Sequence, residues 1–136
     1  MQATTVATTG CVMGGVKTLL RLEGLAVLTA AVFLYWHAGF SWTQFAVLFL
    51  APDLTFAAYL LGPRVGAAAY NAAHSTNGAL GLAVAAVALA QPAMIAVALI
   101  WLAHIGFDRA LGYGLKYGKG FGFTHLGRIG RNAQEN

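Results

Sequence analysis

Apolar residues dominate four long stretches of the chain, at about 17–38, 42–61, 65–90 and 92–116. Each stretch is long enough to cross the roughly 30 Å hydrocarbon core of a bilayer as a helix. The pattern predicts an all-α, integral membrane four-helix bundle. The segments outside it, 1–16 and 117–136, are rich in small or polar residues, and we expect a flexible N-terminal tail and a cytoplasmic C-terminal tail.

The composition supports the membrane interpretation. Only 9% of the residues are charged and 59% are hydrophobic, whereas soluble domains contain roughly 25% charged residues. The net charge of +4 does not indicate nucleic acid binding, because the basic residues fall near apolar-stretch ends that a four-crossing arrangement places on one side: Lys17, Arg21, Arg64, Arg109, Lys116, Lys119, Arg128 and Arg131. This bias predicts that both termini are cytoplasmic and that the bilayer is the partner.

Polar residues interrupt the second and third stretches. Pro52 cannot donate a hydrogen bond to the carbonyl of Leu48, so we expect a kink that opens space beside Asp53. The third stretch carries small and polar residues in its first half and apolar ones in its second, and we expect one continuous helix over 65–90.

Four ionisable residues fall at similar depth in these stretches. Counted at 1.5 Å per residue, Asp53, His74 and His104 lie about 12 to 18 Å from the cytoplasmic helix ends, and Asp108 lies one turn nearer, on the same helix face as His104. Such residues are costly in a membrane and often mark a function. Two His and two Asp suit Zn²⁺ or a similar divalent ion.

The same four residues also allow a structural interpretation. Asp108 could pair with Arg21 or Lys116, and Asp53 could be protonated or bond to Asn71 or Tyr70. The two His would then be neutral hydrogen-bonding groups between helices.

Further polar residues are predicted in a layer closer to the cytoplasmic surface. With a metal that activates water, Glu23 is the candidate general base or a residue that orients the metal ligands, and Arg109, the candidate catalytic residue, or Lys116 would hold an anionic headgroup or phosphate. The candidates for substrate contact or support of the metal ligands are Arg21, Tyr70, Asn71, Tyr113 and Lys116. His125 lies in the C-terminal tail, which could fold back over the cytoplasmic mouth.

Five motifs carry a resemblance to a known family: RLEG at 21–24, LAPDL at 50–54, GPRVGAAAYNAAH at 62–74, WLAHIGFDRALGYGLKY at 101–117 and FTHLGRIG at 123–130. On these the chain is identified as a member of domain-of-unknown-function family 4260, small bacterial four-helix membrane proteins. The resemblance implies a multi-pass protein of the bacterial inner membrane and supplies no activity.

A more distant similarity is to membrane-bound proteins described as metal-dependent hydrolases. Their pattern has Pro-Asp, a later His, and His-x-x-x-Asp followed by Gly, which Pro52, Asp53, His74, His104, Asp108 and Gly112 or Gly114 repeat in order. The chain lacks their Arg-Gly-x-Thr-His-Ser block around the middle His and has Asn71 and Ser75 there.

Three functions follow as hypotheses. The first is a metal-dependent hydrolase of an amphiphilic substrate, such as a lipid-linked phosphate or ester. The second is a non-enzymatic accessory or scaffold subunit of a larger membrane complex or homo-oligomer. The third is a proton or ion translocator that uses the two Asp and two His residues as a relay.

Overall fold

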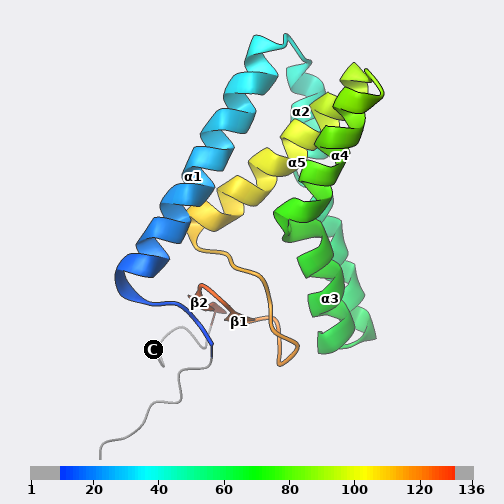
Figure 1. The fold of residues 1–136 in the computed structure, drawn as a ribbon. Helices are drawn as coiled ribbons and strands as arrows, with labels where there is room; N and C mark the ends of the chain where they lie inside the picture. Colours follow the sequence, from blue (N-terminus) through cyan, green and yellow to red (C-terminus); the bar gives the residue numbers. More distant parts are fainter. Residues whose placement is uncertain (1–9, 131–136) are drawn as a thin grey trace, which may run out of the picture.

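The computed structural model describes residues 10–130, which are mostly helical (Figure 1). The elements in chain order are α1 (Gly14–His37), α2 (Trp42–Leu48), the 3₁₀ helix η1 (Ala51–Leu61), α3 (Pro63–His74), α4 (Thr76–Ala88), α5 (Pro92–Leu111), β1 (Phe123–Thr124) and β2 (Gly127–Arg128). The outer parts of the predicted tails, 1–9 and 131–136 with Arg131, lie outside the described residues.

Three helical segments are long and apolar enough to cross a membrane: Gly14–His37, Trp42–Leu61 and Pro92–Leu111. Large apolar side chains cover their outer surfaces, and Leu54 and Leu60 are 77% and 90% exposed. Soluble monomers rarely expose apolar surface on this scale. The predicted helical architecture is confirmed, and its surface is compatible with a bilayer.

The second predicted helix changes its type near Pro52. α2 ends at Leu48, and from Ala51 the chain continues as a 3₁₀ helix. The Asp53 amide donates to the carbonyl of Leu50, three residues back (3.1 Å). The interruption predicted at Pro52 is therefore present, and it places Asp53 in the first turn of η1.

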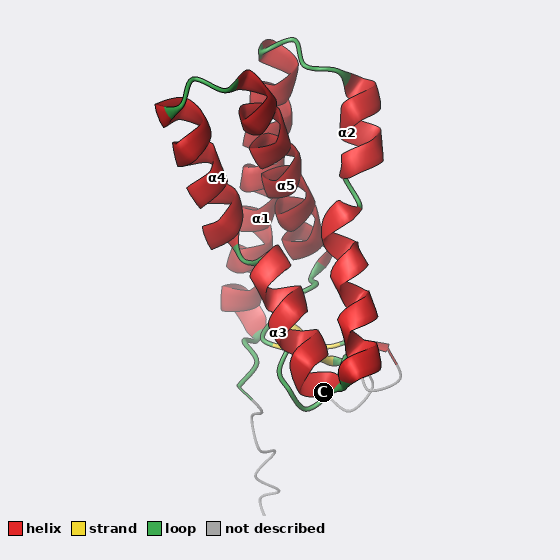
Figure 2. Cartoon of the chain, turned by 90° about the vertical axis from the view of Figure 1, so that its right-hand side faces the viewer, coloured by secondary structure: helices red, strands yellow, loops and turns green. Residues whose placement is uncertain are grey.

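The third predicted helix is not continuous, so the prediction of one helix over 65–90 is wrong. α3 ends at His74, and Ser75 has an extended backbone before α4 begins (Figure 2). Ser75 to Gly78 reads Ser-Thr-Asn-Gly, residue types that favour helix ends over helix interiors. The break leaves His74 as the last residue of α3.

The fourth predicted helix is shorter than expected, so its extension to 116 is also wrong. Gly112 closes α5 in the left-handed conformation (φ 95°), and the Tyr113 amide bonds to the carbonyl of Asp108 (2.8 Å). Glycine adopts this conformation without the steric cost of a Cβ atom. Tyr113 and Lys116 therefore lie beyond the helix.

The described parts of the two tails are joined to each other. β1 and β2 form an antiparallel hairpin, and Lys116 pairs with Thr124 next to it. The Val12 amide donates to the carbonyl of His125 (2.8 Å). The expectation of a flexible N-terminal tail is corrected for 10–16, because Val12 is bonded to the C-terminal segment and α1 already begins at Gly14. The hairpin folds back on the bundle at the start of α1 (Figure 1).

α1 and α5 form the most extensive helix pair in the structure. They cross where Gly24 and Gly106 face the opposite backbone: a Cβ atom on Gly106 would lie 2.6 Å from the amide nitrogen of Leu28 and 2.7 Å from the carbonyl oxygen of Gly24. The absence of side chains allows this approach. The crossing holds α5 in place.

We predict that Gly106→Ala separates α1 from α5. The added methyl group meets backbone atoms, which cannot move aside locally, so the free energy of unfolding should fall by roughly 1–3 kcal/mol. Gly81→Ala is the matched control, because Gly81 is a helical glycine and a Cβ atom added there would have nothing within 4 Å. Unfolding in detergent measures both; equal stability of the two variants would contradict the prediction.

Candidate metal centre

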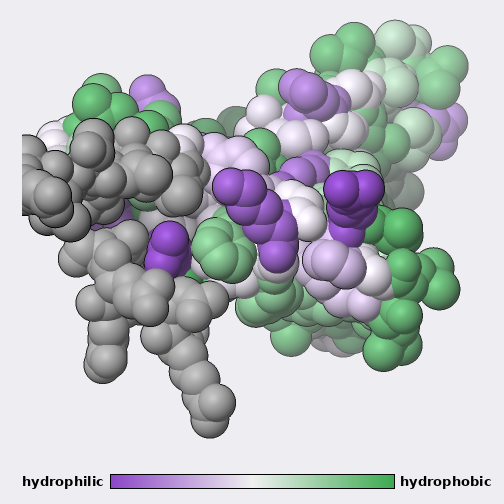
Figure 3. All heavy atoms as spheres, turned by 90° about the horizontal axis from the view of Figure 1, so that it is seen from below, coloured by the Kyte–Doolittle hydropathy of each residue, from purple (hydrophilic) through white to green (hydrophobic). Residues whose placement is uncertain are grey.

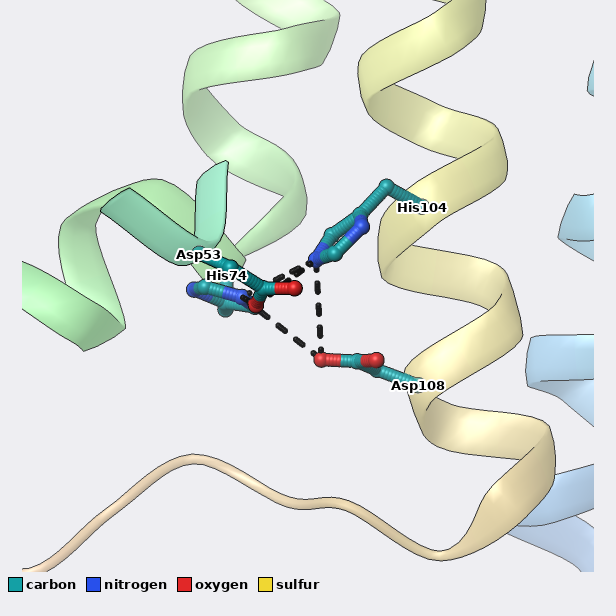
Figure 4. Close-up of side chains that lie close together, drawn as sticks. All are labelled: Asp53, His74, His104 and Asp108. Atoms are coloured by element: carbon teal, nitrogen blue, oxygen red, sulfur yellow. Dashed lines mark hydrogen bonds and ion pairs between the residues drawn. The ribbon is translucent and has the colours of Figure 1, made fainter. Parts of the chain in front are cut away.

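Asp53, His74, His104 and Asp108 meet at one point between η1, α3 and α5 (Figure 4). The His74 Nε2 atom lies 3.3 Å from Asp53 Oδ1, 3.5 Å from Asp108 Oδ2 and 3.1 Å from His104 Nε2. The His104 Nε2 atom lies 3.4 and 3.7 Å from the same two oxygens. The prediction that these residues come together is confirmed.

The spacing of the four atoms fits a tetrahedral metal ion. Zinc bonds to nitrogen and oxygen at roughly 2.0–2.1 Å, which separates tetrahedral ligand atoms by about 3.3–3.4 Å. Five of the six distances between these atoms, those that involve a His nitrogen, range from 3.1 to 3.7 Å, and the sixth, between the two carboxylate oxygens, is within 4.8 Å. The donor set of two imidazoles and two carboxylates is also one that zinc accepts.

The His74 ring is positioned from its other side. The Nδ1 atom lies 2.9 Å from the carbonyl oxygen of Tyr70, which can only accept, so Nδ1 carries the proton and Nε2 presents its lone pair to the other ligands. The ring also stacks on Tyr70, with centroids 3.7 Å apart. Metal-binding histidines are normally held in this way.

His104 is held by packing instead. Its Nδ1 is buried and has no hydrogen-bond partner in the described structure, and the edge-to-face contact with Phe49 has a centroid distance of 5.3 Å. Asp108 is also held from outside the group, because the Tyr70 hydroxyl donates to its Oδ2 atom (3.2 Å). Asp108 therefore pairs with neither Arg21 nor Lys116.

The carboxylates, and not the imidazoles, face a cavity. The two His are at most 1% exposed, whereas the Asp53 and Asp108 side chains are 32% and 13% exposed. The cavity has a volume of about 440 Å³ and is lined by Asp53, Phe56, Tyr70, Asp108, Tyr113, Lys116, Phe121, Ile129 and Gly130. It lies toward the hairpin end of the bundle, where hydrophilic residues gather (Figure 3).

Side chains of α5 stabilise the broken end of α3. The Trp101 indole donates to the carbonyl of Ala73 (2.6 Å), and the Arg109 Nη2 donates to the carbonyl of His74 (2.9 Å). These two carbonyls belong to the last turn of α3, where no helical donor follows. Trp101 was not predicted as a site residue, and the sequence contains no signal that its ring nitrogen points to a helix end.

The Arg109 side chain bonds to backbone carbonyls at the ends of helices. Its Nη1 atom donates to the carbonyl of Tyr113 (2.8 Å) in addition to the Nη2 bond, and Arg109 does not line the cavity. Arg21 similarly donates to the carbonyl of Ala110 at the end of α5 (2.8 Å). Neither guanidinium faces the cavity, so the predicted anion-holding role of Arg109 is not supported.

Glu23 lies away from the site. It is exposed on α1, and its side chain makes no hydrogen bond or ion pair among residues 10–130. The cause is the helix register: the next residue, Gly24, faces α5, so Glu23 points about 100° away from it. The predicted role as general base is therefore dropped.

Lys116 is the positively charged residue in the cavity lining. The Asn71 side chain bonds both backbone groups of Lys116, at 2.7 and 2.8 Å. The Lys116 Nζ atom donates to the carbonyl of Phe121 (3.0 Å) and lies 3.7 Å from the centre of that ring. Burial lowers the pKa of Lys116 to about 8, and the negative charge of Asp108 partly opposes the shift.

Phe121, Ile129 and Gly130 bring the C-terminal segment into the cavity wall. His125 fixes this segment, because its Nδ1 atom accepts a hydrogen bond from the Leu115 amide (2.9 Å). The tail therefore folds back, which the sequence left open. In the sequence, the compact FTHLGRIG run at 123–130 was the feature that could have indicated a folded C-terminal segment.

One family model matches the chain. It is described as "Domain of unknown function (DUF4260)" and matches residues 17–129, which include the four candidate ligands and the hairpin. No curated protein and no solved structure matches the chain.

We predict that Trp101→Phe destabilises the broken end of α3. The substitution removes the hydrogen bond to Ala73 and should lower the free energy of unfolding by about 1–3 kcal/mol, because a partly buried carbonyl loses its donor. Trp36→Phe is the control, since Trp36 is 61% exposed and its indole makes no hydrogen bond among the described residues. Equal unfolding curves for the two variants would refute the role of Trp101.

A second prediction concerns the charge of Lys116. In chelator-treated protein, the ammonium should lose its proton near pH 8 rather than near the ordinary value of 10.5. Since the native state releases this proton first, the group should make the free energy of unfolding rise with pH between these values. NMR of ¹³Cε-labelled lysine follows the titration, and Lys116→Met assigns the signal. Titration at 10.5 or above would contradict it.

Proposed function

The chain belongs to the family described as domain of unknown function DUF4260, so we propose its function from the site itself. The protein binds one divalent ion, such as Zn²⁺, through Asp53, His74, His104 and Asp108 and uses it to hydrolyse an ester or phosphate bond of an amphiphilic substrate. The observation that carries this proposal is the convergence of four donor atoms within 4.8 Å of one another beside a cavity.

Charge balance supports a metal at this position. Two neutral imidazoles and two carboxylates neutralise a divalent cation, and both imidazoles are buried. Without a cation, two carboxylates would lie close together around the paired imidazoles in a poorly hydrated site. Such an arrangement is costly unless protons or a metal compensate the charge.

The cavity supports a reaction at this site. Substrate can approach only from the side of the carboxylates, because the imidazoles are enclosed by η1, α3 and α5. A bound divalent ion would act as a Lewis acid toward a substrate oxygen and promote attack by water. A catalytic ion needs an open coordination position for water. With Glu23 outside the site, Asp53, the more exposed carboxylate, would leave the ion to open this position and would then take the proton of the water, while Tyr70 orients Asp108.

An ion relay is the second candidate, and one observation ranks it lower. On the other side of Pro52, a cavity of about 270 Å³ is lined almost entirely by apolar residues: Leu48, Ala51, Pro52, Thr55, Ala73, Val97, Ile100 and Trp101. A relay needs polar groups on both sides of the buried Asp and His residues. In the part of the chain that the structure describes, the cavity with polar lining lies on the hairpin side of these residues and the apolar one on the other side.

We also propose that the protein is a multi-pass protein of the bacterial inner membrane with both termini in the cytoplasm. Basic residues at the hairpin end support this orientation, since Lys17, Arg64, Lys119 and Arg128 all lie at helix starts or in the C-terminal segment. The positive-inside rule places that end in the cytoplasm. Assembly with a larger complex or with further copies of the chain remains an additional proposal.

The test is the metal content of the purified protein. Elemental analysis of protein prepared without chelator should find about one divalent ion per chain. His104→Ala should lose it, and the isosteric Asp53→Asn should weaken the affinity by more than about tenfold, since even residues that only support metal ligands contribute 10- to 100-fold.

His37→Ala is the matched control, because His37 is exposed at the opposite end of α1. It should retain the metal. Absence of stoichiometric metal from folded wild-type protein, also after addition of Zn²⁺, would overturn the proposal.

A further inference from the structure

We infer that the cavity binds an oxyanion, held between the metal site and the ammonium group of Lys116. The inference rests on the proposed metal site and names the ligand class that this site takes. Lys116 and the carboxylates of Asp53 and Asp108 line the same cavity, so one ligand can reach both.

The Lys116 ammonium is buried without a counter-ion. The residue is 5% exposed, and no carboxylate among residues 10–130 forms an ion pair with it. An ammonium has three donors, and one of them bonds to the Phe121 carbonyl. The other protein partners of the Nζ atom are the faces of Phe121 and Tyr70, with centroids at 3.7 and 4.7 Å. Donors remain for a ligand oxygen.

The position of this ammonium is fixed by the fold. Asn71 binds the Lys116 backbone from α3, and the bridge to Thr124 fixes it to the hairpin. A lysine that only solubilised the surface would not be buried or anchored from two elements. The ammonium group is therefore preorganised for binding, since little side-chain freedom is lost when a ligand binds.

The net charge of the cavity lining depends on whether the metal is bound. Asp53 and Asp108 contribute two negative charges and Lys116 one positive charge, so the lining is negative without a metal and positive with a divalent ion. Arg109, which lies behind the lining, shifts both states in the positive direction. Anion binding should therefore require the metal, and by linkage the anion should strengthen metal binding by the same factor.

The aromatic residues of the cavity lining favour an amphiphilic ligand. Phe56, Tyr70 and Phe121 are aromatic, and Phe56 stacks on Tyr70 and contacts Phe121 with centroids 5.4 and 5.3 Å apart. Such surfaces accept an apolar or ring-containing body beside the charged group. A phosphate ester with an apolar substituent combines both features, whether it is a soluble molecule or a lipid headgroup.

The experiment measures binding of diphenyl phosphate to zinc-loaded protein in detergent by calorimetry. Wild-type protein should bind this anion only with zinc present, and should not bind its neutral methyl ester. Lys116→Met should weaken binding by roughly 10- to 100-fold, the contribution of a hydrogen bond to a charged group. Lys119→Met is the control, because Lys119 is exposed and outside the cavity, and it should bind as wild type.

Nanodiscs distinguish the two sources of the phosphate ester. If the ligand is a lipid headgroup, phosphatidylglycerol nanodiscs should displace diphenyl phosphate, and nanodiscs of an uncharged glycolipid, which lacks the phosphate, should not. If it is a soluble ester, neither should. Both results support the oxyanion site.

Two results would overturn the inference while the metal proposal stands: zinc-bound wild type that binds the neutral ester as well as the anion, or zinc-bound Lys116→Met with unchanged affinity for the anion. The first comparison uses wild-type protein, so it holds even if the variant does not fold. Failure of wild-type protein to bind zinc would overturn both proposals.

Discussion

Pairing of backbone carbonyls limits where a helix in a bilayer can be interrupted. Hydrocarbon offers no water to a free carbonyl, and each unpaired one costs several kcal/mol. The chain nevertheless breaks between α3 and α4, and it can do so because Trp101 and Arg109 of α5 donate to the carbonyls of Ala73 and His74. The break and the packing of α5 therefore depend on each other.

Helix ends place the candidate ligands. Asp53 is in the first turn of η1, and His74 is the last residue of α3; Asp108 is in the last turn of α5, just before Gly112. A side chain at a helix end can approach a site that backbone hydrogen bonding would otherwise enclose. The same ends leave room for the hairpin, which closes the cavity with Phe121 and Ile129.

The sequence predicts depth better than it predicts direction. Counting residues along helices placed Asp53, His74, His104 and Asp108 together, because the α-helical rise of about 1.5 Å per residue gives their depths closely enough even though η1 is a 3₁₀ helix with a rise of about 2.0 Å. The same counting could not give the direction of the Glu23 side chain, because depth does not say which face of α1 a residue occupies. The break at Ser75 was missed although Ser75 to Gly78 are residue types that favour helix ends, because the donors that permit the break come from α5. Counting residues also could not show that α5 ends before Gly112 and that Lys116 lies beyond the helix.

The site joins two parts of the bundle that otherwise touch little. α1, α2 and α4 each pack on α5, whereas η1 and α3 pack mainly on each other. The contacts from the η1 and α3 pair to α5 include the four candidate ligands, the Tyr70 bond to Asp108 and the two bonds at the broken helix end. A cation bound by ligands from both parts would stabilise their association in addition to any chemistry. Binding and fold are then coupled, because a ligand set assembled from separate segments exists only when those segments are docked.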